Sequence, residues 1–377
     1  MKKVIHNLFP CLIILTVVSG SDMRIGALGG NPGFWPEDDQ NIYMFPATIN
    51  NFNLAQIRGI SSSGDGGDYY EGSSDEENDN ASAVFLWGDN TKYGFFMDGQ
   101  DNLVKFGYGD GTWGLLVGLD MDNIESTDSV TVWIENPEDY YSGGSWETSA
   151  VTTKASGMDV NAAFGMNMGF GELGVGFNMS SSDNDNDNDD DDPSLMSIGA
   201  NLRREQALWE FSHLLASFNL ISASMGDAEA TNIGLSLNLF RHWDINTDTD
   251  LLFAIGFGFS SLTENSGLPD AKDVKTMNIT LPSYTFGVET NLLDWATVRA
   301  GVNNDHTLRN SVDNGSTTSS SMGDGDFALA FGLGLEYGGF TLDIDLNPGF
   351  FTNPVNHITG NNLLSPLASQ ATITYSW

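Results

Sequence analysis

Ala368-Ser-Gln-Ala-Thr-Ile-Thr-Tyr-Ser-Trp377 is the stretch of sequence that decides the fold. Small polar residues separate apolar residues that recur at every second position and share one face: Ala371, Ile373, Tyr375 and Trp377. This period of two predicts a β-strand with one apolar and one polar face. The apolar face either covers a soluble core or faces lipid, and the terminal tryptophan suits a bilayer interface.

The other end of the chain has the pattern of a secretory signal peptide. Lys2 and Lys3 precede an apolar run at residues 8–18, and small residues follow the run. We therefore expect residues 1–20 to be a signal peptide, because a charged start, a short apolar run and small residues at the cleavage site define this class. Cys11, the single cysteine, lies inside the run. The exported chain is expected to have no disulfide and no thiolate metal site.

Alternating runs recur in the second half of the chain. Large apolar residues alternate with small or polar ones at residues 233–239, 251–259, 327–335 and 340–346. The chain has 43 glycines. Many lie inside such runs, where they suit curved strands and close packing in a lumen. No segment after the signal has the pattern of a membrane helix, so the exported chain is either a secreted all-β protein or a barrel.

Connection lengths separate these two alternatives. Traced back from the C-terminus, long connections (348–367, 304–325, 122–155) alternate with short ones (337–339, 291–294, 110–112). Bacterial barrels have long outer loops and short periplasmic turns. The sequence therefore predicts an all-β fold: a transmembrane antiparallel up-and-down β-barrel in the bacterial outer membrane, with both termini periplasmic.

The predicted strand number is fourteen to sixteen. Every alternating run from Asn53 onward gives about sixteen strands, an even number as closed bacterial barrels prefer. The early runs at residues 83–87, 93–97 and 103–108 are shorter than the roughly 9–11 residues of a spanning strand. Fourteen strands result if some of these runs belong to other elements.

The acidic residues are abundant and clustered. The formal net charge is −37, and stretches such as 65–79, 183–192 and 313–326 collect the acids. This sign excludes nucleic acid as a partner and favours divalent cations over anions. We expect residues 52–377 to form the barrel with long acidic extracellular loops, in contact with outer-membrane lipid and lipopolysaccharide. The last strand resembles the insertion signal that barrel-assembly machinery reads, carried here by Ile373, Tyr375 and Trp377.

A distinct motif lies at residues 21–51, ahead of the first predicted strand. A Gly-Gly pair, an acidic pair and a Pro-Ala pair follow one another: Gly29, Gly30, Asp38, Asp39, Pro46 and Ala47. This order resembles the N-terminus of the long-chain fatty-acid transporter FadL and of PorV-like barrels, although Phe45 replaces the family asparagine. The resemblance implies a fourteen-stranded barrel with a lumenal plug, and a transport or scaffold role. In the simpler alternative the glycines and the proline only shape turns around a packed plug.

Side chains alternate between the two faces of a strand, and this alternation places five charged residues on the lumen side of the predicted barrel: Glu289, Arg299, Glu336, Asp343 and Asp345. Such charges either line a water path or hold a plug by ion pairing. Arg299, among several acids, is the best candidate partner for the plug or a constriction, and an ordinary solvated lumen is the alternative. Tryptophans near the predicted strand ends are expected to form an interfacial girdle: Trp113, Trp209, Trp243, Trp295 and Trp377.

The acidic run at residues 183–192 places carboxylates at alternate positions: Asp183, Asp185, Asp187 and Asp189. Calcium takes several oxygen ligands, and the spacing is similar to the start of a calcium loop. The run lacks the turn glycine and the distal glutamate of such a loop. One interpretation is a hydrated outer loop held extended by repulsion. The other is weak calcium binding that bridges lipopolysaccharide phosphates, and no other cofactor is predicted.

The sequence does not predict an enzyme. His213 directly follows Ser212, and adjacent residues on a strand face opposite ways, so we expect them not to form a nucleophile–base pair. No serine-hydrolase elbow, zinc motif or nucleotide loop occurs in the sequence.

The leading hypothesis is FadL-like passive transport of hydrophobic or small solutes across the outer membrane. Movement of the plug, or a lateral gap between strands, would admit the ligand. The alternatives are a PorV-like scaffold for secreted or surface-attached proteins and a structural or general porin. Large apolar residues around a lumenal pocket would favour transport of a hydrophobic small-molecule ligand. Small lumen faces favour a packed plug, and an outer surface of ordered loops would favour a scaffold with a secreted protein as its partner.

Overall fold

The computed structural model describes residues 23–61, 81–98, 104–134, 145–184, 192–268, 271–315, 317–323, 325, 327–348 and 368–377. The expected signal peptide lies outside these ranges. The described helices are α2 (Met23–Ala27), η1 (Pro32–Phe34), α3 (Asn41–Met44) and η2 (Pro46–Asn51). None of them is long and apolar enough to cross a membrane.

Seventeen strands follow the helices in the described ranges. They are β1 (Leu54–Ser61), β2 (Ser82–Gly88), β3 (Lys92–Asp98), β4 (Val104–Gly109), β5 (Trp113–Ile134), β6 (Ser145–Met168), β7 (Gly171–Asn184), β8 (Pro193–Leu208), β9 (Phe211–Met225), β10 (Ala228–Asn246), β11 (Thr249–Asn265), β12 (Val274–Leu293), β13 (Ala296–Asp313), β14 (Thr318–Gly323), β15 (Phe327–Tyr337), β16 (Phe340–Leu346) and β17 (Ala368–Ser376).

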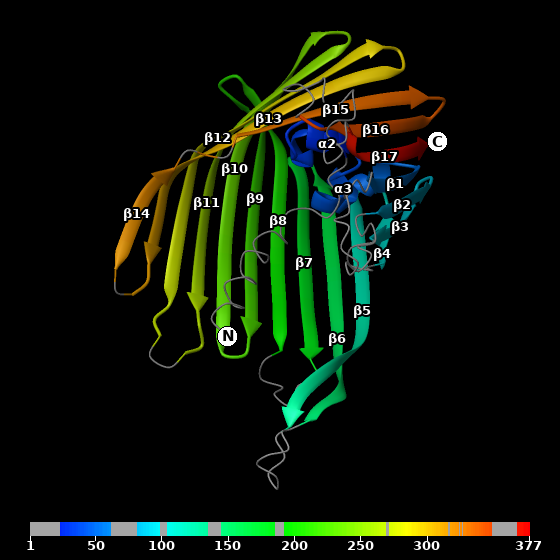
Figure 1. Ribbon diagram of the computed structural model, residues 1–377. Coiled ribbons are helices and arrows are strands. Elements are labelled where there is room, and N and C mark those ends of the chain that lie inside the picture. The colour runs from blue at the N-terminus through cyan, green and yellow to red at the C-terminus, as the bar shows by residue number, and fades with distance from the viewer. Residues whose placement is uncertain are drawn as a thin grey trace, which may run out of the picture.

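These strands form one closed antiparallel sheet (Figure 1). Sequence neighbours pair with one another, and β1 pairs with both β2 and β17, which closes the ring. Strands β14 and β15 both pair with β13, along different parts of it, so together they occupy one place in the ring. The described chain is therefore a sixteen-stranded up-and-down barrel. The predicted fold class is confirmed at sixteen strands, and the fourteen that the family resemblance implies are not observed.

The two faces of the wall follow the alternation in the sequence. On β9 and β10, Phe218 and Leu235 point outward and are each 40% exposed. Between these large residues lie small or polar ones such as Asn219 and Gly234, which pair across the strands on the lumen side. An apolar outer face and a polar inner face are characteristic of transmembrane barrels. Indole and phenol rings gather at the turns, where Trp209 is 85% and Tyr337 is 87% exposed.

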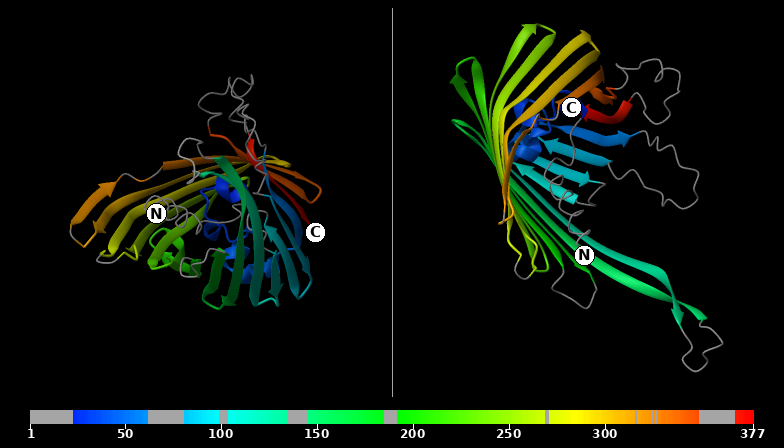
Figure 2. Two further views of the ribbon diagram at one scale, coloured as in Figure 1. Left: turned by 60° about the horizontal axis from the view of Figure 1, so that its bottom comes forward. Right: turned by 60° about the vertical axis from the view of Figure 1, so that its left-hand side comes forward.

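Strand length varies strongly around the ring. Strands β1–β4, β16 and β17 have six to nine residues, whereas β5 has 22 and β6 has 24. The early runs, whose assignment was open in the sequence, are consecutive wall strands. The expected long loop at residues 122–155 is wrong, because most of it extends β5 and β6 as a paired hairpin. This hairpin reaches well beyond its neighbours (Figures 1 and 2).

Residues 23–51, called the N-terminal segment below, lie inside the ring of strands (Figure 1). Helix α2 contacts β13, β15, β16 and β17, and η2 contacts β3 to β7. Two apolar clusters combine residues of the segment with residues of the wall. The core of the described molecule is therefore the boundary between this segment and the lumen face of the barrel.

Candidate functional site

Four glycines aligned across neighbouring strands carry one half of the N-terminal segment. Gly109, Gly114, Gly165 and Gly174 are paired in register on β4 to β7 and form what we call the glycine row. A Cβ atom on Gly165 would lie 2.6 Å from the Ala47 nitrogen, and Cβ atoms on Gly114 and Gly174 would overlap backbone carbonyls of the segment. Backbone therefore packs directly on backbone here, a close approach that glycine permits.

Helix α2 rests on a second group of glycines on β12, β13 and β15. A Cβ atom on Gly332 would lie 2.5 Å from the Ala27 Cβ, and Gly301 is equally close to Leu28. The helix ends at Ala27, and the following Gly29 and Gly30 have φ values of 104° and 79°. L side chains rarely adopt this left-handed region, so glycine is required for the chain to turn here.

Apolar side chains fill the remaining space between the segment and the wall. In the first cluster, Phe34 and Trp35 pack on wall residues: Leu215, Phe240, Leu252 and Ala254. In the second, Ile42 and Ile49 pack on another part of the wall: Leu54, Val84, Leu86, Phe96 and Leu116. All these side chains are nearly fully buried. Removal of this apolar surface from water favours the docked segment.

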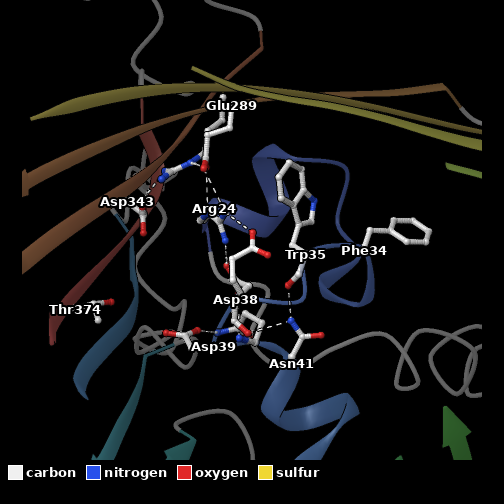
Figure 3. Close-up of polar contacts among 12 residues, drawn as sticks. Arg24, Phe34, Trp35, Asp38, Asp39, Asn41, Glu289, Asp343 and Thr374 are labelled. Carbon is white, nitrogen blue, oxygen red and sulfur yellow. Dashed lines mark hydrogen bonds and ion pairs between the residues drawn. The ribbon is translucent and has the colours of Figure 1, made fainter. Parts of the chain in front are cut away.

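A chain of alternating charges joins α2 to the wall (Figure 3). The Arg24 Nε donates to the Glu289 Oε2 at 3.0 Å, and the Arg299 Nε donates to the same oxygen at 2.6 Å. Arg24 also pairs with Asp38 of the segment, and Arg299 pairs with Asp343 of β16. Partial burial strengthens such pairs, and removal of one partner leaves an uncompensated charge.

Asp39 faces the strands that close the barrel. One of its oxygens lies 3.7 Å from an Arg58 guanidinium nitrogen, and the other accepts a hydrogen bond from the Gln56 Nε2 at 3.0 Å. Arg58 also donates to the Tyr43 hydroxyl at 3.2 Å. Gln56 in turn donates to the Thr374 Oγ1 at 2.7 Å. The segment is thus fastened to β1 and, through Gln56, to β17.

Arg203 on β8 holds a third point of the segment. It donates to the Gly33 carbonyl at 3.1 Å and to the Asn41 Oδ1 at 2.8 Å, while Glu172 of β7 pairs with it at 2.5 Å. Its guanidinium carbon lies 4.6 Å from the centroid of the Phe45 ring. Several directed hydrogen bonds together with ring stacking suit arginine better than lysine.

Two charged groups of the segment have shifted acidities. Burial, and then repulsion by Asp38, raises the pKa of Asp39 to about 6, although Arg58 acts in the opposite direction. Burial opposes the charge of Arg24, but the carboxylates of Asp38 and Glu289 outweigh it and raise the pKa of Arg24. Arg24 therefore stays charged, whereas Asp39 titrates near neutral pH.

One part of the lumen wall beyond the segment is neutral and polar. A recess of about 390 Å³ lies on the lumen face of β8 to β12. Seven lining residues carry amides or hydroxyls: Asn201, Asn219, Asn232, Ser217, Ser236, Ser260 and Thr280. The other lining residues are three glycines and Phe218, Leu235 and Phe259. Of the described residues that line it, none carries a charge. Amides and hydroxyls both donate and accept hydrogen bonds, so this part of the wall suits hydrated or polar contents.

The residues predicted for the site fall into four groups. Asp38, Asp39, Glu289, Arg299 and Asp343 lie together in the ion-pair clusters, and Pro46 and Ala47 lie on the glycine row. Glu336 is exposed and Asp345 is half-buried, both on the lumen side of the wall. Asp183 is exposed and lies one residue before the end of β7, and the other candidate calcium ligands, Asp185, Asp187 and Asp189, lie outside the described residues.

Sequence reasoning missed Arg24, Arg58, Arg203 and His242 as partners. The His242 Nε2 lies 2.7 Å from the Phe34 carbonyl oxygen, and its Nδ1 lies 2.8 Å from Asp250. The sequence contains a signal that could have identified them. Basic residues are rare in this chain, and three of these four lie at lumen positions of wall strands.

The expected separation of Ser212 and His213 is wrong. The Ser212 Oγ and the His213 Nδ1 lie 2.8 Å apart. Nδ1 is the ring nitrogen nearest the backbone, and the pairing of β8 with β9 is irregular between Glu205 and Leu208, so strict alternation does not separate these two atoms. His213 also stacks on Phe240, at 4.9 Å between ring centroids, which gives the imidazole a packing role.

No protein-family model matches the sequence, and no curated protein matches it. Several solved outer-membrane proteins are similar at low identity. The toluene transporter TodX of P. putida is 9% identical over 95% of this chain and 99% of its own, with a TM-score of 0.35. OmpT of Vibrio cholerae is 10% identical over 86% and 95%, with a TM-score of 0.29. The translocator domain of the autotransporter NalP from Neisseria meningitidis is 11% identical over 93% and 99%, with a TM-score of 0.27. These TM-scores are low, so the description of the fold as a closed barrel rests on the strand pairing and not on these similarities.

Proposed function

We propose that this protein is an outer-membrane channel that its N-terminal segment keeps closed and that passes small polar solutes when the segment moves. The observation that carries the proposal is the difference between two parts of the lumen, one filled by the segment and one lined by neutral polar residues. Ion pairs at Arg24 and Arg58 and hydrogen bonds from Arg203 fasten the segment at one end, and a neutral polar recess lies beyond it. A polar interior is what a water-filled barrel requires.

The outer surface supports the proposed location. Large apolar side chains face outward around the wall, and aromatic rings gather at the turns. Closed barrels with this surface belong to outer membranes, where the apolar band contacts lipid. In this proposal both termini are periplasmic, lipid and lipopolysaccharide surround the wall, and β17 carries the signal for barrel assembly.

The lining of the recess favours small polar solutes over hydrophobic ones. Asparagine, serine and threonine make up seven of its thirteen lining residues. Transfer of an apolar solute into such a site leaves amides and hydroxyls without partners, which costs free energy. Among the alternatives from the sequence, transport of small solutes therefore has more support than transport of a hydrophobic ligand.

Liposome swelling tests this proposal. The double variant Asp38→Asn with Glu289→Gln removes the two carboxylates that hold Arg24, and we expect faster swelling in small neutral solutes than with the intact protein. Glu336→Gln with Asp248→Asn is the matched control, because it removes the same charge at exposed positions. A folded double variant that swells no faster than this control contradicts the proposal.

The long hairpin of β5 and β6 favours a second candidate function, a scaffold for secreted proteins. In the described ranges, β4 pairs with β5 only as far as Leu119, and β7 pairs with β6 only from Ala155 onward. Among the described residues beyond these points, 125–134 and 145–154 pair with one another as a two-stranded hairpin. An extended peptide can add to the edge of such a hairpin. Loss of a secreted protein from the cell surface on shortening the hairpin, with solute flux unchanged, would support this role.

A further inference from the structure

We infer that the recess on β8 to β12 is a binding site for neutral, multiply hydroxylated solutes such as small saccharides. This inference rests on the proposed function, since the recess lies where a solute meets the closed side of the channel. Ser217 is two residues beyond Leu215 on β9, and Leu215 belongs to the apolar cluster that contains Phe34 and Trp35. The recess therefore begins where the apolar packing of the segment ends.

Amides on three adjacent strands supply the recognition chemistry. Asn201 pairs with Ser217, and Ser217 pairs with Ser236, so one register row presents an amide and two hydroxyls. The next row runs through Gly199, Asn219 and Gly234. Each amide offers two donors and an acceptor, and each hydroxyl offers both functions. A solute with several hydroxyl groups matches this array, because each of its groups also donates and accepts.

Glycine gives the recess its depth and fixes one of the amides. Gly199, Gly234 and Gly258 lie in its lining on β8, β10 and β11. The Asn219 Oδ1 occupies the space that a Cβ atom on Gly234 would need, so the amide of Asn219 lies across β10. The volume of about 390 Å³ lies within the range of small-molecule sites.

The lack of charge in the lining selects neutral solutes. The chain carries a formal charge of −37, yet the described residues around the recess are uncharged. An anion would be repelled by the protein as a whole, and any ion would lose hydration here without gaining a counter-charge. A neutral saccharide exchanges water for amide and hydroxyl partners, so it avoids this cost.

Calorimetric titration of the folded full chain with lactose and with lactobionate tests the inference. These probes share a galactosyl unit and differ in charge. We expect saturable lactose binding with a Kd on the order of 1 mM, and at least tenfold weaker binding of lactobionate. Asn219→Leu should weaken lactose binding about tenfold. Asn178→Leu, which changes a lumen asparagine on β7 outside the recess, should leave it unchanged.

Two further results separate this inference from the proposed function. Asn219→Asp keeps the shape of the side chain and adds a charge. This variant tests the site if Asn219→Leu does not fold, and we expect Asn219→Asp to weaken lactose binding. If lactose does not bind saturably, the inference is overturned even if lactose crosses liposomes. It is also overturned if Asn178→Leu loses as much lactose affinity as Asn219→Leu. Saturable binding with no flux through the variants that release the segment overturns the channel and leaves the binding site standing.

Discussion

Arg24 of the N-terminal segment and Glu289 of strand β12 form a direct ion pair, with 3.0 Å between the Arg24 Nε and the Glu289 Oε2. The same carboxylate oxygen accepts a hydrogen bond from Arg299 of the wall at 2.6 Å. One acidic side chain thus neutralises a cation of the segment and a cation of the barrel. Loss of the Glu289 carboxylate would leave Arg24 and Arg299 in a partly buried site with less negative charge to balance them.

Glu289→Gln should therefore loosen the segment. Loss of one partner of a buried ion pair costs roughly 3 kcal/mol, and we expect faster protease cleavage within residues 23–51 while the barrel stays folded. Glu336→Gln is the control, because Glu336 shares the lumen face but is exposed. Equal cleavage of the two variants would show that Glu289 does not hold the segment.

The glycine row gives a steric prediction. Gly165→Leu places a side chain where Pro46 and Ala47 now lie, and we expect the segment to leave its site, with increased hydrogen exchange at residues 44–50. Gly176→Leu on β7 is the matched control, because no atom lies within 4 Å of the Cβ position at Gly176. Unchanged exchange in folded Gly165→Leu would contradict the close backbone packing described here.

The raised pKa of Asp39 predicts a pH dependence of docking. Its pKa rises from an ordinary value of 3.8 to about 6 in the docked segment, so the docked state binds more protons between these values. The contribution of Asp39 to docking is therefore most favourable below pH 3.8 and is lost as pH rises through 6, by up to about 3 kcal/mol. Protease cleavage of the segment should be faster at pH 8 than at pH 5.

Asp39→Asn should flatten this pH dependence, because the residue then carries no titrating group. Asp248→Asn, in an exposed turn, should keep the dependence of the intact protein. If the cleavage rate of Asp39→Asn still rises with pH as steeply as in the intact protein, another group controls docking.

Arg203 provides a test of donor geometry. Arg203→Lys keeps the charge but cannot reach both the Gly33 carbonyl and Asn41 while stacking on Phe45, so we expect a loss of about 1–3 kcal/mol in docking. Arg204→Lys is the neighbouring control on the other face of β8. Hydrogen exchange at residues 33–45 measures the effect, and identical protection in the two variants would rule out the proposed role of Arg203.

The wall could be predicted from the sequence because its signal is local. The run at residues 251–259 alternates so regularly that it defines both faces of β11, and the turn at residues 337–339 separates β15 from β16 as expected. Strand ends are weaker signals. Residues 122–134 and 145–155 are expected in a loop from the sequence, and their pairing with each other makes them strands.

The contacts of the N-terminal segment could be predicted only in part. The alternation of side chains along the strand places Arg299 on the lumen side, but the contact of Arg299 with Glu289 depends on the register between β12 and β13. The partners of Arg58 and Arg203 depend on how residues 23–51 cross the lumen, which is set by apolar packing and by the glycine row together. No spacing within the sequence carries that information, because these contacts join residues far apart along the chain.

Single-channel conductance in planar bilayers tests the central claim most directly, by comparison of the intact protein with a variant that lacks residues 21–51. We predict a silent intact barrel and an open pore after the deletion, with folding of both proteins checked by circular dichroism. Silence of both folded proteins would mean that the lumen is closed without the N-terminal segment, which would contradict its role as the element that closes the channel.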